Sequence, residues 1–132
     1  MGGREPELRL SPMDVLLLSA DLATSSTVSG AAARCGVACQ TAWSVDEIVE
    51  KAIALAPRLV VLDLSTPRVD PATLVPQLRD LASPPQRIVA FGPHVHESRL
   101  AAAREAGCDE VVSRGRFHAD LDEILNSSTR EA

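Results

Sequence analysis

The segment 58–64, with the sequence Arg-Leu-Val-Val-Leu-Asp-Leu, constrains the fold of this 132-residue chain more than any other feature. Its centre is continuously apolar and lacks the alternation of a strand that has one face in water. Such runs are typical of parallel sheets, because helices cover both faces of the sheet. The segment therefore predicts a buried strand, and Asp63 places a carboxylate at its end.

Short apolar runs alternate with helix-period segments along the rest of the chain. Asp21 can cap a first helix that ends near Gly36, and Ser44 with Glu47 forms a capping box for a second. A proline is unfavourable inside a helix, and Pro76 lies inside the third predicted helix. The expected strands are 13–18, 37–42, 58–64, 88–91 and 110–112, and the expected helices are 21–36, 44–55, 71–81, 97–106 and 119–125, the last capped by His118 or Asp120.

Five strands in alternation with five helices predict an α/β fold. Right-handed crossovers and this number of elements favour a flavodoxin-like, doubly wound, five-stranded parallel sheet of order 2-1-3-4-5, with helices on both faces. We assign residues 13–126 to this domain, residues 1–12 to a flexible N-terminal tail and residues 127–132 to a C-terminal tail.

Composition and charge exclude several classes of partner. The 13 basic and 18 acidic side chains give a net charge of −5, the basic ones are scattered and aromatic residues are few, so we expect no nucleic-acid partner. No apolar stretch follows a basic start, and the longest apolar run, 15–18, is far too short to cross a membrane. The three cysteines lack metal-type spacing and are expected to be reduced. These features predict a cytoplasmic protein with no membrane partner.

Polar and charged side chains follow the ends of the predicted strands. In open parallel sheets, function is found beyond the carboxyl ends of the strands, so these positions are the candidate site. They are Ser19, Ala20 and Asp21 after the first strand, Trp43 after the second, Asp63 and Pro67 at the third, Gly92 and His94 after the fourth, and Ser113, Arg114 and Gly115 after the fifth.

The segment 59–70 resembles the phosphoacceptor strand of bacterial response-regulator receiver domains of the chemotaxis-regulator type, with Pro67 four residues after Asp63. The segment 101–111 looks like the fourth helix and fifth strand of the same family. The resemblance extends over residues 13–126 and implies a role in two-component or phosphorelay signal transduction.

The resemblance also implies roles for single residues, and most of the expected groups are missing. A receiver holds Mg²⁺ with an acidic pair after its first strand and with its phosphoacceptor aspartate. The pair falls on Ser19 and Ala20, the phosphoacceptor is Asp63, and Asp21 lies one or two residues out of register. Mg²⁺ needs several oxygen ligands, so we expect no metal or other cofactor unless Asp21 rescues the site.

Other receiver positions are changed as well. The hydroxyl residue that ends strand four is Gly92, and the lysine after strand five is Arg114. The proline after that lysine is Gly115, and the aromatic switch residue is Val111. Because an arginine can pair with a carboxylate in a bidentate way, we hypothesise that Arg114 bonds Asp63 directly and that this ion pair replaces Mg²⁺ and phosphate.

Three functions follow from this pattern. The first is a degenerate pseudo-receiver that is not an enzyme, except for any self-phosphorylation or dephosphorylation on Asp63. It would contact a histidine kinase or an output protein, or form a homodimer, through helix 97–106, strand 110–112 and the last helix. The second is an active receiver that a histidine kinase phosphorylates on Asp63 with Mg²⁺. The third is a flavodoxin-like small-ligand binder, which the absence of a Gly-rich loop after the first strand disfavours.

Two further features have open interpretations. His94 and His96 could bind a transition metal or simply lie in a solvated loop. Trp43 could pack against the helix that follows it or anchor a partner. Cys39 and Cys108 are expected at the opposite end of the sheet from all of these residues.

Overall fold

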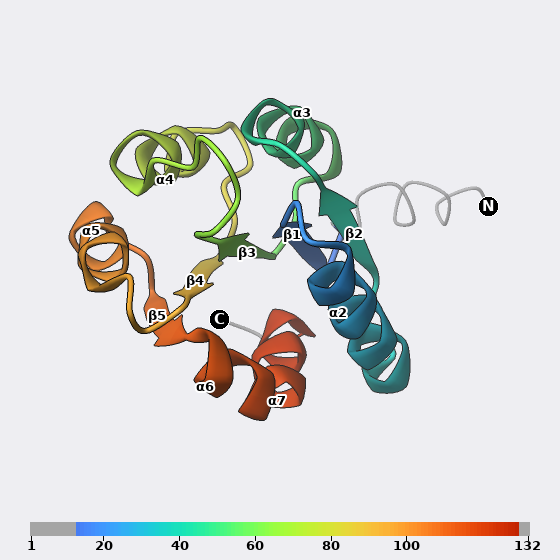
Figure 1. Ribbon diagram of the computed structural model, residues 1–132. Helices are drawn as coiled ribbons and strands as arrows, with labels where there is room; N and C mark the ends of the chain where they lie inside the picture. Colours follow the sequence, from blue (N-terminus) through green and yellow to red (C-terminus); the bar gives the residue numbers. More distant parts are fainter. Residues whose placement is uncertain (1–12, 130–132) are drawn as a thin grey trace.

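The structure, a computed structural model, describes residues 13–129 and confirms the predicted parallel sheet of order β2-β1-β3-β4-β5 (Figure 1). The strands are β1 (Val15–Leu18), β2 (Cys39–Ala42), β3 (Leu59–Asp63), β4 (Arg87–Gly92) and β5 (Glu110–Ser113). The helices are α2 (Leu22–Cys35), α3 (Val45–Leu55), α4 (Pro71–Arg79), α5 (Glu97–Ala106), α6 (Arg114–Ala119) and α7 (Leu121–Asn126), and a 3-10 turn η1 (Ser127–Thr129) follows.

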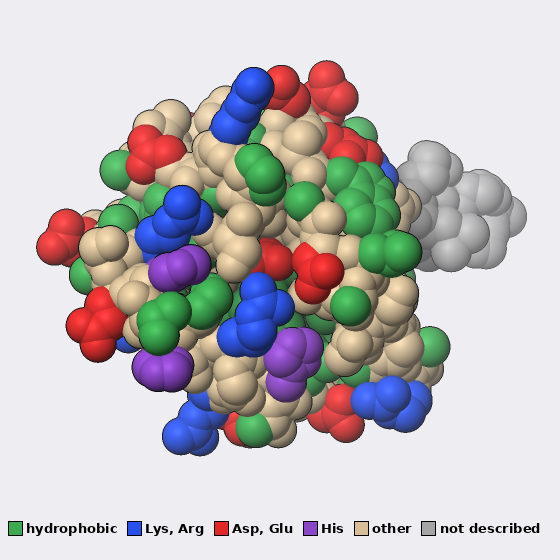
Figure 2. Space-filling model, in the orientation of Figure 1, with side chains coloured by type: hydrophobic (Ala, Val, Ile, Leu, Met, Phe, Trp, Pro, Cys, Tyr) green, Lys and Arg blue, Asp and Glu red, His purple; other side chains and the backbone are tan. Residues whose placement is uncertain are grey.

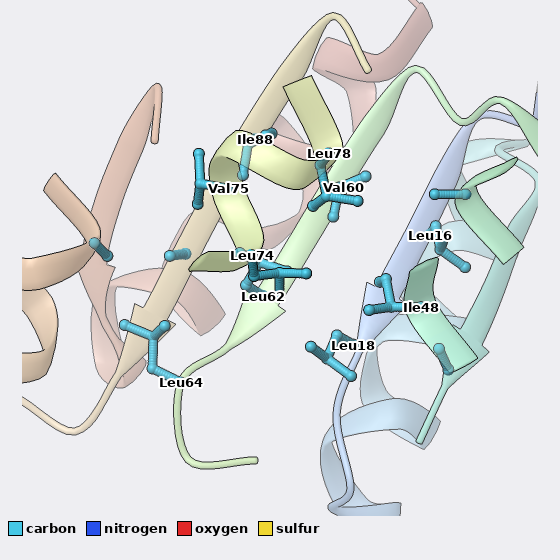
Figure 3. Close-up of a cluster of buried hydrophobic side chains, with 14 of the residues drawn as sticks. Leu16, Leu18, Ile48, Val60, Leu62, Leu64, Leu74, Val75, Leu78 and Ile88 are labelled. Carbon is cyan, nitrogen blue, oxygen red and sulfur yellow. The ribbon is translucent and has the colours of Figure 1, made fainter. Parts of the chain in front are cut away.

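The sheet is covered on both faces, as the continuous apolar strands require. Helices α3, α4 and α5 lie on one face, and α2, α6 and α7 lie on the other (Figure 1). Successive residues of β1 and β3 point to opposite faces: Leu18 and Leu62 pack under the first helix layer, and Leu17 under the second. Figure 3 shows the first of these clusters, in which side chains of β1, β3 and β4 meet those of α3 and α4.

Local sequence signals set the ends of the first two helices. The Asp21 carboxylate accepts a hydrogen bond from the Thr24 N–H at 3.2 Å, and Gly36 closes α2 in the left-handed conformation with φ of 69°. Ser44 caps α3, but the reciprocal bond of the capping box is shifted by one residue, since Glu47 Oε1 accepts from the N–H of Trp43 at 2.7 Å.

The predicted helix 119–125 is present as α7, with Asp120 at its N-cap, but the sequence did not predict the short helix α6 that precedes it. The Ser113 hydroxyl accepts the Arg116 N–H at 3.1 Å, so α6 begins directly after β5 at Arg114. Phe117 on α6 is fully buried and stacks on Phe91 of β4 with ring centroids 4.0 Å apart. Tertiary packing therefore fixes a helix whose six residues carry little periodic signal.

Smaller differences occur at other element ends. Strand β2 begins at Cys39 and not at residue 37, and α4 ends at Arg79 although Pro76 lies inside it. Residues 127–129, which the sequence assigned to a tail, form η1, where the buried Ser128 hydroxyl donates to the Leu125 carbonyl at 2.8 Å. The rest of the predicted tails, 1–12 and 130–132, lies outside the described residues.

Across residues 13–129, every helix is too short or too polar to cross a lipid bilayer.

We predict that Phe117→Ala lowers the free energy of unfolding by about 3–5 kcal/mol, because it removes a fully buried ring and its stacking contact with Phe91. Urea unfolding measures the loss. Ile53→Ala is the control, since this side chain is 65% exposed and its truncation should change stability by less than about 0.5 kcal/mol. Equal effects of the two substitutions would contradict the packing described here.

Candidate functional site

The carboxylate of Asp63 lies at the centre of the candidate site and is almost completely buried. Its side chain is 1% exposed. Oδ2 accepts a hydrogen bond from the Ser19 hydroxyl at 2.8 Å, and Oδ1 accepts one from the Ser65 N–H at 3.0 Å. A buried charge is costly unless it is paired and hydrogen-bonded, so these two donors make the buried carboxylate tolerable.

Ser19 reaches Asp63 because β1 and β3 are neighbouring parallel strands. Leu18 pairs with Leu62 in the register of the sheet, which puts the next residue of each strand side by side. Ser19 is itself fully buried, and its oxygen also accepts the N–H of Asp21 at 3.1 Å. Where receivers carry an acidic residue, this chain therefore has a hydrogen-bond donor to the aspartate.

Arg114 lies at the first position of α6 and faces the same carboxylate. Its Nη2 is 3.8 Å from Asp63 Oδ1, an ion-pair distance that is too long for a hydrogen bond. Its guanidinium donates instead to the hydroxyls of Thr24 and Ser65, both at 3.3 Å, and lies 5.7 Å from the ring centroid of Phe91.

The hypothesis that Arg114 bonds Asp63 directly is thus corrected in one respect. The two residues form an ion pair, but neither a bidentate contact nor a direct hydrogen bond is made. The direct side-chain bond to Asp63 comes from Ser19, whose position in the family pattern had indicated only a lost ligand.

The Asp21 side chain is the N-cap of α2. Its Oδ2 accepts from both the N–H and the hydroxyl of Thr24, at 3.2 and 2.5 Å. The hydrogen bond from the Thr24 side chain is the main cause that lowers the pKa of Asp21 from its ordinary value. Asp21 and Asp63 both line a hollow of about 260 Å³, together with Ala20 and Ser65. Figure 2 shows acidic side chains next to a basic one near the middle of this face.

A Mg²⁺ site in this hollow would have to be built from the carboxylates of Asp21 and Asp63. The ion needs a nearly octahedral set of oxygens, usually with one or two carboxylates that are free to bind it. Both carboxylates of the hollow already accept hydrogen bonds from the protein. Among residues 13–129, no three His, Cys, Asp or Glu side chains come together in a group that could hold a metal ion, and this applies to His94 and His96 as well.

At Gly92, apolar side chains pack against the position where receivers have a hydroxyl residue. A Cβ added there would lie 3.4 Å from Leu64 Cβ and 3.7 Å from Leu100 Cδ2. Arg99 of α5 donates from Nη1 to the Leu64 carbonyl at 2.6 Å and so ties the loop after β3 to α5. Sequence reasoning missed this contact, because nothing in the pattern links Arg99 to residue 64.

Trp43, the candidate residue after β2, lies beside a different hollow. Trp43 is 45% exposed and lines a second hollow of about 400 Å³ with Val45 of α3 and with Pro67 and Arg68 from the loop after β3. Arg68 has a left-handed backbone with φ of 69°. Trp43 therefore lies at the start of α3 beside this hollow and is nearly half exposed.

The other candidate residues near the ends of β4 and β5 do not line the hollow around Asp63, and the cysteines lie at the other end of the sheet. His94 and Val111 line a third hollow between α5 and β5, and Gly115 is exposed on α6. As expected, Cys39 and Cys108 lie at the amino ends of β2 and β5, away from the site. Burial raises the pKa of each thiol to about 11, which disfavours the reactive thiolate.

Comparisons with known proteins identify the fold. No protein-family model and no curated protein matches the sequence. A response-regulator signal receiver domain from Bermanella marisrubri superposes with a TM-score of 0.78 at 19% identity, over 89% of this chain and 99% of its own. The receiver domain of the sensor histidine kinase PA1611 from Pseudomonas aeruginosa gives 0.74 at 14% identity, over 89% and 97%. The chemotaxis regulator CheY4 of Vibrio cholerae gives 0.73 at 15% identity, over 89% and 99%. The chain therefore has the fold of response-regulator receiver domains.

We predict that Ser19→Ala destabilises the protein by about 1.5–3 kcal/mol, because the buried Asp63 carboxylate loses its side-chain donor. Chemical denaturation measures the loss. Ser98→Ala, at an exposed position of α5, is the matched control and should stay within about 0.5 kcal/mol of the parent. If both variants unfold like the parent, the hydrogen bond is not important for stability.

We also predict a pH dependence from the lowered pKa of Asp21. A carboxyl whose pKa is lower in the folded state stabilises the fold above its unfolded pKa, near 3.8, and this stabilisation is lost as the pH falls through the folded pKa. Asp21→Asn keeps a capping oxygen but cannot titrate. The stability difference between parent and variant, from urea unfolding, should therefore be constant above about pH 5 and shrink as the pH is lowered through 3.8 and below. A difference that is constant with pH would contradict the assignment.

Proposed function

We propose that this protein is a degenerate receiver module, which transmits signals in a two-component or phosphorelay system by protein contacts and without Mg²⁺-dependent phosphorylation. The observation that supports this proposal most is the hydrogen bond from Ser19 to Asp63. It occupies a phosphoacceptor oxygen with a protein donor at the position where the family has a metal ligand. A cytoplasmic location and the absence of a cofactor belong to the same proposal.

The chemistry of phosphoryl transfer supports this assignment. The transition state spreads charge over the phosphoryl oxygens, and positioned cations and hydrogen-bond donors stabilise it. Here the donor set does not fit Mg²⁺, and Gly92 supplies no hydroxyl. Loss of a single such donor costs about 3–4 kcal/mol in other active sites. Asp63 would also have to leave its 1% exposed position before it could attack phosphorus.

A different assignment is an active receiver phosphorylated on Asp63 by a histidine kinase. One observation favours it: Asp21 and Asp63 line the same hollow, so a rearranged α2 cap would bring two carboxylates to one ion. Two of the similar structures show the chemistry that this assignment needs: the PA1611 receiver domain holds a magnesium ion in its active site cleft, and an NtrC4 receiver dimer is beryllofluoride-activated. A small-ligand binder is less favoured, because no Gly-rich loop follows β1.

We predict that the protein gains no phosphoryl adduct when it is incubated with Mg²⁺ and acetyl phosphate. Intact mass spectrometry detects the adduct, and the fluorescence of Trp43, the only tryptophan, follows beryllofluoride binding next to the site. Both signals should be the same for the parent and for Asp63→Asn. An adduct on the parent that is lost in Asp63→Asn would establish the active receiver instead.

A restored variant serves as the positive control. Ser19→Asp with Ala20→Asp places the acidic pair of the family next to Asp63, where it removes the hydrogen-bond donor and supplies carboxylates. We expect this variant to bind Mg²⁺ more tightly than the parent in calorimetric titrations. Equal Mg²⁺ affinity of the two proteins would show that Ser19 is not what keeps the ion out.

A further inference from the structure

The hollow of about 400 Å³ beside Trp43 lies next to the smaller one around Asp63, since Ala20 lines both. Three separate segments form its walls: the loop after β1, the chain from Trp43 into the first turn of α3, and the loop after β3. Its volume lies in the range of small-molecule binding sites. The hollow therefore has the size and the convergence of chain segments that a small ligand needs.

The walls of this hollow are largely apolar and include an aromatic ring. Ala20, Val45 and Pro67 supply aliphatic surface, and Trp43 is 45% exposed. Figure 2 shows a broad hydrophobic patch over the region of β2 and α3 on this face. Burial of exposed apolar surface is favourable, and aromatic rings pair in stacked or edge-to-face arrangements. The apolar part of a matching ligand is therefore an aromatic ring.

Two charged side chains of opposite sign complete the lining, Arg68 from the loop after β3 and Asp46 from the first turn of α3. Both residues are exposed, and within residues 13–129 neither side chain makes an ion pair or a hydrogen bond. A guanidinium can hold a carboxylate through two parallel hydrogen bonds, and a carboxylate accepts hydrogen bonds from an ammonium group. The polar part of a matching ligand therefore carries one negative and one positive group.

The backbone at Arg68 is a second, independent observation. Its φ of 69° lies in the left-handed region, which is uncommon for a residue with a side chain. Among residues 13–129 the other such residue is Ala56, which is the C-cap of α3, whereas Arg68 lies in a loop. The turn is held by the Thr66 N–H, which donates to the Asp63 carbonyl at 3.0 Å, and by the Val69 N–H, which donates to the Thr66 carbonyl at 3.3 Å. Such conformations cluster at functional sites, which fits a guanidinium placed for a ligand.

We propose that the hollow between Trp43 and Arg68 binds a free aromatic α-amino acid. The ring of the ligand lies against Trp43, Arg68 binds its carboxylate and Asp46 binds its ammonium group. This ligand gives each charged residue of the lining a counterpart, whereas a simple aromatic acid would leave Asp46 facing a like charge. The missing Gly-rich loop argues against ligands that carry phosphate and does not affect a zwitterion. The inference goes beyond the proposed function and does not depend on it.

The test titrates the full chain with free L-phenylalanine. Trp43 is the only tryptophan and lines the hollow, so its fluorescence, excited where phenylalanine does not absorb, reports binding directly. We expect a saturable change with the free amino acid. N-acetylphenylalanine lacks the positive charge, phenylalanine amide lacks the carboxylate and alanine lacks the ring, so each should bind at least roughly tenfold more weakly.

Matched variants test the two charges. Asp46→Asn and Arg68→Gln should each weaken phenylalanine binding roughly tenfold, because the zwitterion loses one charged partner. Glu50→Gln, at an exposed position one turn further along α3, removes a negative charge outside the hollow. Arg34→Gln, on α2 with the side chain 67% exposed, does the same for a positive charge. Both controls should bind phenylalanine like the parent.

A glycine variant separates binding from folding. Glycine adopts a left-handed backbone without the steric cost that arginine bears, so Arg68→Gly should be at least as stable as the parent in urea unfolding. It should nevertheless bind phenylalanine as weakly as Arg68→Gln does. Trp43→Ala should also bind more weakly, and calorimetry measures this variant because its fluorescent reporter is lost.

Amide NMR shifts on addition of phenylalanine should map to the residues that line the hollow, among them Ala20, Val45 and Arg68. Absence of a saturable signal, equal affinity for phenylalanine and its analogues, shifts that map elsewhere, or unchanged binding by Asp46→Asn and Arg68→Gln would each overturn the inference. None of these results bears on phosphorylation of Asp63, which the acetyl phosphate experiment tests, so each proposal can fail without the other.

Discussion

The hydrogen bond between Ser19 and Asp63 is the interaction on which the rest of the site depends. A carboxylate at the end of the central strand is 1% exposed, and a charge so deeply buried needs donors for its oxygens. Ser19 supplies one from the neighbouring strand, and the loop backbone at Ser65 supplies the other. The protein thus satisfies internally a group that the receiver pattern associates with a metal ion.

Other hydrogen bonds near Asp63 tie the loop after β3 to neighbouring helices. Arg114 bridges α2 and the loop after β3 through Thr24 and Ser65, and its guanidinium lies over a core ring. Arg99 holds the same loop to α5 through the Leu64 carbonyl. Cationic side chains therefore link the loop after β3 to helices on both faces of the sheet. Such links hold the loop after β3 against both helix layers.

Sequence reasoning predicted the sheet order and the residues at its carboxyl edge, because buried strands and helical periods leave strong patterns. It could not predict what replaces a missing ligand, since Ser19 looks like a simple loss until the register Leu18 with Leu62 sets it beside Asp63. Helix α6 was missed for a similar reason: six residues carry little period, and stacking of Phe117 on Phe91 decides their structure. Sequence patterns could not predict contacts between single side chains that lie far apart in the chain.

The most direct test of this account is a Mg²⁺ titration followed by the amide NMR signal of Ser65, whose N–H is bonded to the Asp63 carboxylate. The account predicts only small, unsaturable shifts through the millimolar range, the same in the parent as in Asp63→Asn. A saturable shift in the parent that disappears in Asp63→Asn would show that the carboxylate releases its protein donors to bind the ion, and would contradict the account.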